Sequence, residues 1–482
     1  MTIKSSDAAD PSLSFEKDIE AEFGQAESQY GRKMSNYRRA YDYGDMELPL
    51  DSGIPTSGSI SFSDFYSKEL NVIVDAYSGD TVRQINAKTL WKNNRTNVGD
   101  SRLRKSTAAI RNCKNVIVHV NKRIGSVTED QIKGQDQVAF TTGDWDAGTN
   151  LKIYVGGEGL IAGGGGKGGD GANYAKGGRP YQDGGNGSSA LGIDYTPTQV
   201  TVMASNHPYK KGSGLGGIVG GCGGGGGGSA ADFWLITPIE KEVDTGIVDR
   251  IENPAYDPET NPDVPPIIDK LDGDGNPITI KETEYWKTLT RFWSAGGGGG
   301  GGAGIPAGKG GKRGELTGKI NAPAGTWLYY DTGERKASIK SASQATVGSN
   351  ADSSLTADNL RDVGMGGEGG DYGVAQNNGA RGGDGGNGGD YSQLGITMYG
   401  YDGQNTQSTG KQYISPASSA QFSTFQERSV PENLPRDNWG GNHGFPGYAV
   451  LCSSSWDNFG TIGHDSSRVI GGVRNDMTPK QG

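Results

Sequence analysis

The sequence predicts a mainly β and irregular fold, with short N-terminal helices, a β-rich middle and glycine-rich bundles of polyproline-II-type helices. The chain has 84 glycines among 482 residues, more than twice the usual share of roughly 7%. Hydrophobic residues make up only 32% of the chain, which is little for a conventional core. Yet it contains 21 Tyr, 11 Phe and 8 Trp, whereas disordered chains are poor in aromatic residues. These observations favour an ordered architecture that depends strongly on backbone contacts.

The first 66 residues are predicted to form an N-terminal module with short helices. Apolar residues at helical spacing follow a suitable N-cap and precede a glycine that can end the helix: Ser14, Phe15, Ile19, Phe23 and Gly24. A second helix is expected at about residues 27–43. After a turn at residues 54–58, the segment 60–65 reads like the segment 13–19. We interpret the two segments as repeated units.

Residues 67–155 are predicted to be rich in β-strands. Two runs, at residues 70–74 and 116–120, are enriched in β-branched side chains. A third run, at residues 151–155, alternates apolar and polar residues, as expected of a half-buried strand. This last strand leads directly into the first glycine tract, which begins at Gly156.

The glycines gather in tracts that we assign to two glycine-rich domains, at residues 156–232 and 294–482, the second including a C-terminal closing segment. Several stretches, such as residues 165–173 and 382–390, repeat Gly-Gly-X with a polar X. A period of three matches the polyproline-II helix, which has three residues per turn and no internal hydrogen bonds. Its backbone groups need partners elsewhere, and a bundle of such helices supplies them. Glycine is required wherever two backbones approach closely.

A flexible glycine linker is the alternative interpretation of these tracts. It suits Gly223–Gly228 and Gly296–Gly302 best, because a homopolymer conceals any period. It suits the triplet tracts poorly, since a linker is expected to be aperiodic and rich in serine. The bundle is therefore the favoured prediction for all the tracts.

A glycine-poor insertion at residues 233–293 separates the two glycine-rich domains. It is acidic and rich in proline, and it is interpreted as a protruding arm or loop. Its segment Asp272–Asn276 resembles the start of an EF-hand loop, but Pro277 and Thr283 occupy positions where that loop needs Gly and Glu. A β-turn between residues 267–268 and 278–280 is the preferred interpretation.

The sequence predicts no catalytic, cofactor or metal site, and the chain is expected not to be an enzyme. Its net charge of −10 argues against binding nucleic acid through phosphate neutralisation. Lys167 and Lys309 follow glycine, but each precedes another glycine and not the Ser or Thr of a phosphate-binding loop. The four histidines lack metal-ligand spacing, and no GxSxG motif is present. Carboxylates are plentiful, so an enzyme that degrades polysaccharides stays open as an alternative.

Two further patterns are interpreted without a ligand. Residues 165–173 nearly match a calcium-binding nonapeptide, but Ala172 stands where a large apolar residue is needed and no tandem copy follows. Cys113, Cys222 and Cys452 lie far apart and form no CxxC pair, so neither a disulfide framework nor a zinc site is predicted.

The N-terminus has no signal-peptide pattern and no run is long enough to span a membrane. We expect a soluble protein that is made in the cytoplasm.

Some of these segments resemble tail-fibre-like virion proteins of T4-like phages, notably marine ones. The match is close over Ile54–Tyr66 and looser over Ser14–Gly24, and the Gly440–Val450 ending and the triplet tracts are also similar. The resemblance implies a phage virion protein of the tail: a fibre, tail-tip or baseplate-associated component that presents a glycine-rich surface for host-cell attachment. It implies other tail proteins as partners, a host-cell receptor and a homo-oligomer, with a trimer expected. A purely structural baseplate, neck or capsid-decoration protein and a polysaccharide-degrading tailspike are the alternatives.

Two groups of residues are candidates for contact sites. The N-terminal units are expected to attach the chain to the virion through Phe15, Ile19, Phe23, Ile60, Phe62 and Phe65. Aromatic rings in or beside the glycine tracts are candidates for receptor contact, because a ring offers a large contact area at low entropy cost: Tyr174, Tyr181, Tyr372 and Tyr391. The alternative is that these four tyrosines shield the edges of the bundle.

Overall fold

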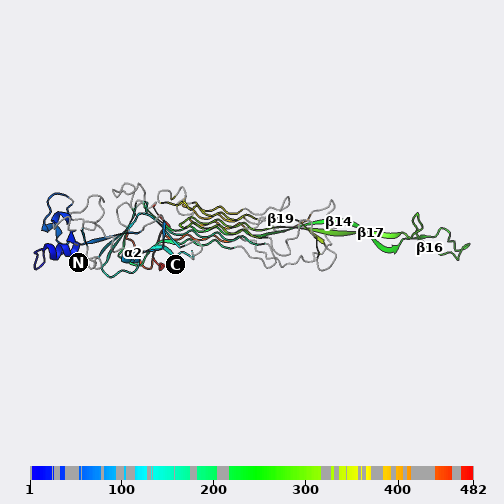
Figure 1. The fold of residues 1–482 in the computed structure, drawn as a ribbon. Coiled ribbons are helices and arrows are strands. Elements are labelled where there is room, and N and C mark those ends of the chain that lie inside the picture. Colours follow the sequence, from blue (N-terminus) through cyan, green and yellow to red (C-terminus); the bar gives the residue numbers. More distant parts are fainter. Residues whose placement is uncertain are drawn as a thin grey trace.

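The computed structural model shows a long rod (Figure 1). An N-terminal module lies at one end, and a β-solenoid, a glycine bundle and a narrow arm follow along the rod. Strands and extended backbone dominate, which confirms the predicted mainly β and irregular fold. The structure describes residues 3–23, 25–26, 33–37, 54–55, 57–76, 81–93, 103–104, 114–127, 132, 134–156, 158–173, 182–202, 216–315, 327–329, 336–343, 345–356, 360, 365–370, 384–391, 398–404, 410–413, 440–458 and 468–480.

The N-terminal module contains the short helices that the sequence predicts. Ser14 caps η1 (Phe15–Glu20), which continues into α1 (Ala21–Phe23), and its hydroxyl accepts a hydrogen bond from the backbone N–H of Lys17. The second unit forms η4 (Phe62–Phe65), where the Ser61 N–H donates to the Asp64 carboxylate at 2.7 Å. Of the helix expected at residues 27–43, the described part is η3 (Met34–Tyr37). A small antiparallel pair also lies in the chain: β1 (Gln25–Ala26) and β5 (Leu103–Arg104).

Parallel strands in three sheets form the β-solenoid. The first sheet contains β2 (Asn71–Asp75), β6 (Asn115–Val120), β9 (Asn150–Val155) and β12 (Gln199–Val202). The second contains β3 (Thr81–Arg83), β7 (Arg123–Gly125), β10 (Leu160–Ala162), β13 (Gly217–Val219) and β22 (Val469–Ile470). The third contains β4 (Ile85–Asn86), β8 (Val138–Thr141), β11 (Ser189–Ile193), β21 (Val450–Cys452) and β23 (Val473–Arg474), and α2 (Ala87–Asn93) follows β4.

The chain winds through the three sheets in turn, since β2, β3 and β4 belong to different sheets and β6, β7 and β8 repeat the order. Equivalent side chains of successive coils therefore stack inside the solenoid. Val118 and Ile153 are paired neighbours in the first sheet, and Val200 pairs with Ile153 on its other side. All three are fully buried. Burial of such columns of Val and Ile stabilises the solenoid, at roughly 25 cal/mol per Å² of apolar surface.

The glycine bundle continues the strands of the solenoid. Ala162 pairs with Val219 at the end of the β10–β13 ladder. The next contacts in line join the Gly163 N–H to the Val219 carbonyl at 2.9 Å and the Gly166 N–H to the Cys222 carbonyl at 2.8 Å. From here the bonds between the two segments recur at every third residue and not at every second. The backbone thus changes from a β-strand to a polyproline-II helix without losing its neighbour.

The tract at residues 220–229 lies inside the bundle, where its N–H groups donate to three neighbouring helices and its carbonyls accept from three others. Every N–H in this tract donates to a backbone carbonyl. Successive donors turn from one neighbour to the next, as Gly223, Gly224 and Gly225 donate to Met398, Gly185 and Gly300. Three residues per turn place these donors on three sides of the helix. This pattern confirms the predicted polyproline-II bundle.

The number of glycines per triplet follows the position of a helix in the bundle. Residues 296–302 are all glycine and all buried, as is the homopolymer at residues 223–228. In the outer tract at residues 345–352, only every third residue is buried: Ala345, Gly348 and Ala351. The two homopolymers, which suited a linker best, therefore lie inside the bundle. A Cβ on Gly225 would come within 1.9 Å of the Gly386 carbonyl oxygen, so no larger residue fits there.

Tracts from both predicted glycine-rich domains belong to this one bundle. The Gly299 N–H donates to the Gly169 carbonyl, and the Gly300 carbonyl accepts from Gly225. The hydrogen bonds therefore join tracts of residues 156–232 and 294–482 in one bundle, and not in two separate domains. The backbone partners that one tract needs come from sequence positions more than a hundred residues away.

The insertion between the tracts forms the arm at the far end of the rod (Figure 1). Its strands, β14 (Ala231–Val248) and β17 (Thr279–Ser294), pair antiparallel from Ala231↔Ser294 to Asp244↔Lys281. At the base of the arm, a five-stranded sheet adds β18 (Trp327–Tyr329), β19 (Lys336–Ser343) and β20 (Gly410–Tyr413). Beyond it, β15 (Arg250–Glu252) and β16 (Ile267–Asp269) form the tip.

Candidate functional site

The tip of the arm, defined as residues 244–281, lies at the end of the rod opposite the N-terminal module (Figure 1). It is a narrow ribbon in which β15 pairs antiparallel with β16. The Asp249 N–H donates to the Ile278 carbonyl, and the Lys270 N–H donates to the Asp249 carbonyl. These bonds connect the ribbon to the strands below it.

Aspartate side chains shape the turns of the tip. The carboxylates of Asp244, Asp257 and Asp272 each accept the backbone N–H two residues further on, at 2.9 Å. Asx turns of this kind order a short loop locally. Hydrogen bonds to the ionised carboxylates lower the pKa of all three aspartates. The largest contribution comes from the Thr279 hydroxyl for Asp244 and from the Thr260 hydroxyl for Asp257. For Asp272 it comes from the Asn276 backbone N–H. The turn predicted at residues 272–276 is confirmed, with Gly275 at a φ of +87°.

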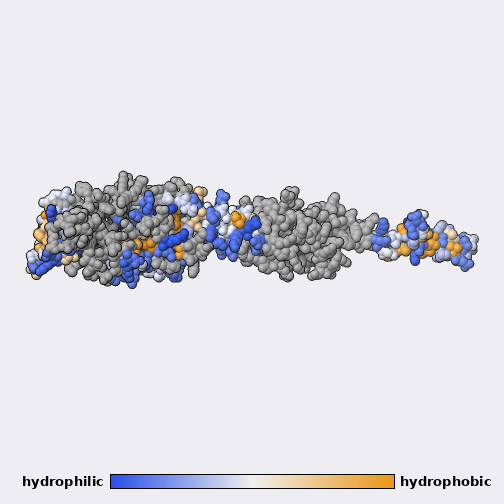
Figure 2. Space-filling view, viewed as in Figure 1, coloured by the Kyte–Doolittle hydropathy of each residue, from blue (hydrophilic) through white to orange (hydrophobic). Residues whose placement is uncertain are grey.

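Large apolar side chains are uncovered on this ribbon. The exposed fraction is 60% for Ile247, 57% for Ile267 and 54% for Leu271, and Ile251, Tyr256 and Ile280 are exposed as well. Figure 2 shows hydrophobic and hydrophilic residues interleaved along the tip. The ribbon is too thin to enclose a core, so this group of exposed apolar side chains indicates a contact surface.

The same ribbon is acidic. Nine acidic and three basic residues lie between positions 244 and 281. Two of the basic side chains form ion pairs within the tip, Arg250 with Asp269 at 3.0 Å and Lys270 with Asp249 at 3.1 Å. Such exposed pairs contribute little to stability, but they leave a clear excess of negative charge. A partner for this surface would combine apolar patches with basic residues.

The predicted attachment residues are divided between the module's interior and its surface. Ile19, Phe23 and Phe65 are fully buried, and the Phe23 and Phe65 rings pack 6.2 Å apart. Phe15 and Ile60 pack partly buried against this core. Phe62 is 39% exposed. The buried three hold the two repeated units together, which leaves Phe62 as the most accessible of the six for a partner.

One of the four tyrosines proposed for receptor contact can be placed. Tyr391 is only 2% exposed, and its hydroxyl donates to the Gly220 carbonyl at 2.6 Å. Receptor contact is therefore not available to Tyr391, and the alternative reading, that it shields the bundle, fits this residue. Burial and then the neighbouring Cys222 raise its pKa well above the ordinary value for tyrosine. Tyr174, Tyr181 and Tyr372 lie outside the described residues.

Within the described part of the chain, no group of three or more His, Cys, Asp or Glu could hold a metal ion. Cys222 and Cys452 are buried free thiols, and burial raises the pKa of Cys222 well above its ordinary value. Cys113 lies outside the described residues. Among the helices that are described, none is long and apolar enough to cross a membrane.

The sequence predicts the arm but not the apolar residues that its tip exposes. Ile267 belongs to the predicted flank of a turn, and Ile251 and Leu271 belong to no predicted site. The available signal was the isolation of these apolar residues among aspartates and prolines. In such a context too few apolar neighbours exist to cover them.

Comparisons with known proteins add one similarity. No protein-family profile matches the chain, and no curated protein matches it. Among solved structures, the gp37–gp38 adhesin tip complex of the bacteriophage S16 long tail fiber is similar over 75% of this chain and 86% of that chain. The sequence identity is 14% and the TM-score is 0.23. A similarity at this level establishes neither a common fold nor a common function.

Proposed function

We propose that this chain is a structural protein of a phage tail, a fibre or tail-tip component that attaches the virion to its host cell. The resemblance of Ile54–Tyr66 and of the triplet tracts to phage tail-fibre-like proteins supports the virion assignment. The observation that carries the attachment role is the arm. It extends beyond the glycine bundle at the end farthest from the N-terminal module (Figure 1), and its tip exposes apolar side chains.

In this proposal each part of the rod has a mechanical role. The N-terminal module binds another tail protein, with Phe62 as the accessible contact. The solenoid and the bundle form the shaft, because many interlocked backbone hydrogen bonds resist bending. The tip of the arm contacts the cell-surface receptor through Ile251, Ile267 and Leu271. A trimer of such chains would present several tips at once, which multiplies a weak individual affinity.

Binding of labelled protein to intact cells of the bacterium that the phage infects tests this proposal. The first variant replaces residues 250–277 by an Asn-Gly turn, which suits a two-residue hairpin. The second combines Ile251→Ser with Ile267→Ser. We expect saturable binding by the original protein, and loss of most of it in both variants, because hot-spot contacts dominate interfaces.

The matched control is Val347→Ser, because Val347 is 60% exposed on the outer face of the bundle. This variant is expected to bind like the original protein. Binding that survives removal of the tip would place recognition elsewhere on the rod. No saturable binding by the folded original protein would support the alternative of a purely structural tail component.

A further inference from the structure

One face of the glycine bundle carries aromatic residues, whereas most outward positions of the other described tracts are polar. Outward positions on most tracts are Lys, Asp, Asn, Ser or Glu, as at residues 309–312, 349–352 and 384–390. On the adjacent tracts at residues 398–404 and 440–448, the outward positions include Tyr399, His443 and Phe445. Outer tracts elsewhere make the same kind of backbone hydrogen bonds with polar side chains at outward positions, so the packing of the bundle does not require these rings.

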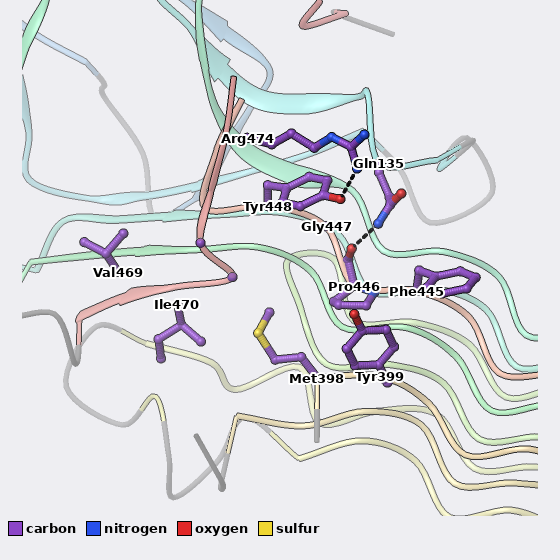
Figure 3. A pocket seen from close by; sticks show the side chains of 12 residues that line it. Gln135, Met398, Tyr399, Phe445, Pro446, Gly447, Tyr448, Val469, Ile470 and Arg474 are labelled. Atoms are coloured by element: carbon purple, nitrogen blue, oxygen red, sulfur yellow. Dashed lines mark hydrogen bonds between the residues drawn. The ribbon is translucent and has the colours of Figure 1, made fainter. Parts of the chain in front are cut away.

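Tyr399 and Phe445 border a hollow of about 750 Å³ where the bundle meets the solenoid. We call it the aromatic hollow, and it is lined by Gln135, Met398, Tyr399, Phe445, Tyr448 and Arg474 together with neighbouring backbone and the Val469 and Ile470 side chains. Figure 3 shows Tyr399 and Phe445 beside each other at one end, and Val469 and Ile470 at the other. This volume lies within the range of sites that hold small molecules or short oligomers, roughly 300–1,000 Å³.

The rings are held in place and yet accessible. Tyr399 packs edge-on against Phe445 with centroids 5.8 Å apart, and His443 packs 5.5 Å from Phe445. The Asp402 carboxylate fixes His443, since it accepts the His443 backbone N–H at 2.8 Å and lies 2.7 Å from Nδ1. Nevertheless Phe445 is 51% exposed and Tyr399 is 39% exposed. A preformed ring surface of this kind binds with little loss of conformational entropy.

Hydrogen-bonding groups stand opposite the rings. One Arg474 nitrogen donates to the Tyr448 hydroxyl oxygen at 2.7 Å, which leaves the tyrosine O–H free to donate to a ligand. The Gln135 amide nitrogen donates to the Pro446 carbonyl at 2.5 Å, which orients the amide at the rim. Arg474 is also paired with Asp476 through two contacts, at 2.5 and 3.1 Å. Its charge is thereby compensated, so the hollow does not select for an anion.

From this combination we propose that the aromatic hollow is a binding site for a short segment of a neutral saccharide. A sugar ring has apolar C–H faces, which can stack on Tyr399 and Phe445, and hydroxyls that both donate and accept. Tyr448 and Gln135 supply matching polar groups. A purely apolar ligand would leave those groups without partners, which costs binding free energy. An anionic polymer would gain little from Arg474 because Asp476 already neutralises it.

This proposal is independent of cell attachment by the arm. It concerns a different part of the rod, between the solenoid and the bundle. A tail protein with both features would have a receptor contact at its end and a saccharide contact along its side. Failure of cell binding by the arm would leave the saccharide site standing, and the reverse is also true.

Saturation-transfer NMR and titration calorimetry on the full chain test the site. The probes are maltotetraose, cellotetraose, mannotetraose and chitotetraose at millimolar concentration. We expect at least one to bind, with saturation transferred most strongly to its ring C–H protons. Phe445→Ala and Tyr399→Ala should each weaken binding by about tenfold or more. The unfolding temperature should stay unchanged in Phe445→Ala, because that ring is half exposed.

Tyr401→Ala is the matched control, since Tyr401 lies on the same tract and is 54% exposed but does not line the hollow. Its binding should equal that of the original protein. Absence of binding by all four probes would overturn the proposal, as would binding that Phe445→Ala leaves intact. A photo-crosslinker at position 445 that captures another tail protein in assembled virions would also overturn it, because the hollow would then be a protein interface.

Discussion

The β-solenoid and the glycine bundle share continuous hydrogen-bonded ladders, yet different forces hold them together. In the solenoid, columns of apolar side chains such as Val118, Ile153 and Val200 are removed from water. The interior tracts at residues 223–228 and 296–302 are glycine throughout, and each backbone N–H of residues 220–229 donates to a carbonyl of a neighbouring segment. Lost volume is therefore the main threat to the solenoid. Added volume is the main threat to the bundle interior, where a Cβ on Gly225 would lie 1.9 Å from the Gly386 carbonyl oxygen.

This comparison explains why an apolar content of 32% is enough for the chain. Glycine loses more conformational entropy on folding than any other residue, and the backbone hydrogen bonds between the described tracts offset this cost. The solenoid supplies an ordered end from which the tracts start in register. The bundle is therefore expected to depend on the solenoid more than the solenoid depends on the bundle.

The largest effect is expected from Ile153→Ala in the solenoid. Ile153 is fully buried between coils, and deleting its side chain leaves a cavity that costs about 2–5 kcal/mol of unfolding free energy. Chemical unfolding followed by circular dichroism measures the loss. Hydrogen exchange should show that bundle amides lose protection as well. Lys152→Ala on the same strand is the control, with a much smaller effect, and an unchanged bundle in Ile153→Ala would contradict the dependence.

Gly225→Ala tests the close packing of the backbones in the bundle. Its Cβ would lie 1.9 Å from the Gly386 carbonyl oxygen and 2.4 Å from the carbon, so the helices must separate, at about 1–3 kcal/mol or more. Amide exchange should accelerate across residues 220–229 and their neighbours while the solenoid strands stay protected. Lys312→Ala adds no volume at an outward position and should leave exchange unchanged. Equal exchange in both variants would rule out close packing at Gly225.

Tyr391→Phe probes a side chain that shields the bundle. The variant loses the hydrogen bond to the Gly220 carbonyl and should lower the unfolding free energy by about 1 kcal/mol. Because burial raises the pKa of Tyr391 well above its ordinary value, the original protein should also retain one tyrosine that resists ionisation in alkaline titration by ultraviolet absorbance. Tyr401→Phe, at an exposed site, should change the unfolding free energy very little. An undiminished stability in Tyr391→Phe would argue against this shielding role.

The smallest expected effect comes from Glu22→Gln in the N-terminal module. Glu22 is 5% exposed and accepts the Leu70 N–H at 2.8 Å. Burial raises its pKa above the ordinary 4.5, against the opposing effect of that hydrogen bond. The folded module therefore holds a proton more tightly than the unfolded chain, so its stability falls as pH rises from about 4.5 through the folded pKa.

Glu22→Gln keeps an acceptor for Leu70 and removes the buried charge. At pH 7 we expect a slightly higher melting temperature and a free energy of unfolding that rises by less than about 1 kcal/mol. The free energy of unfolding should also depend less on pH between pH 4 and 7. Calorimetric scans across that pH range measure both. Glu16→Gln, on the exposed side of the same helix, serves as the control. A melting temperature at pH 7 that drops in Glu22→Gln would show that the ionised carboxylate stabilises the module.

Some of the candidate surfaces could be predicted from the sequence and others could not. The arm was visible because its prolines and aspartates interrupt the glycine tracts. Tyr391 was not recognisable as a buried residue, because its position beside a triplet tract looks the same whether the neighbouring helix covers it or not. The aromatic hollow was missed for a related reason. Its rings lie on two tracts about forty residues apart, and its Gln135 precedes β8 whereas Arg474 lies in β23, near the end of the described chain.

By itself, the sequence determined the local conformations of this protein. Ser14 caps a helix, residues 116–120 and 151–155 form strands, and the Gly-Gly-X period produces polyproline-II helices, because each depends on residues a few positions apart. The tertiary structure alone decided which strands stack into coils and which tracts lie inside the bundle. A homopolymer such as residues 223–228 carries no register of its own. Its place follows from the six backbone segments that surround it, and those come from distant parts of the chain.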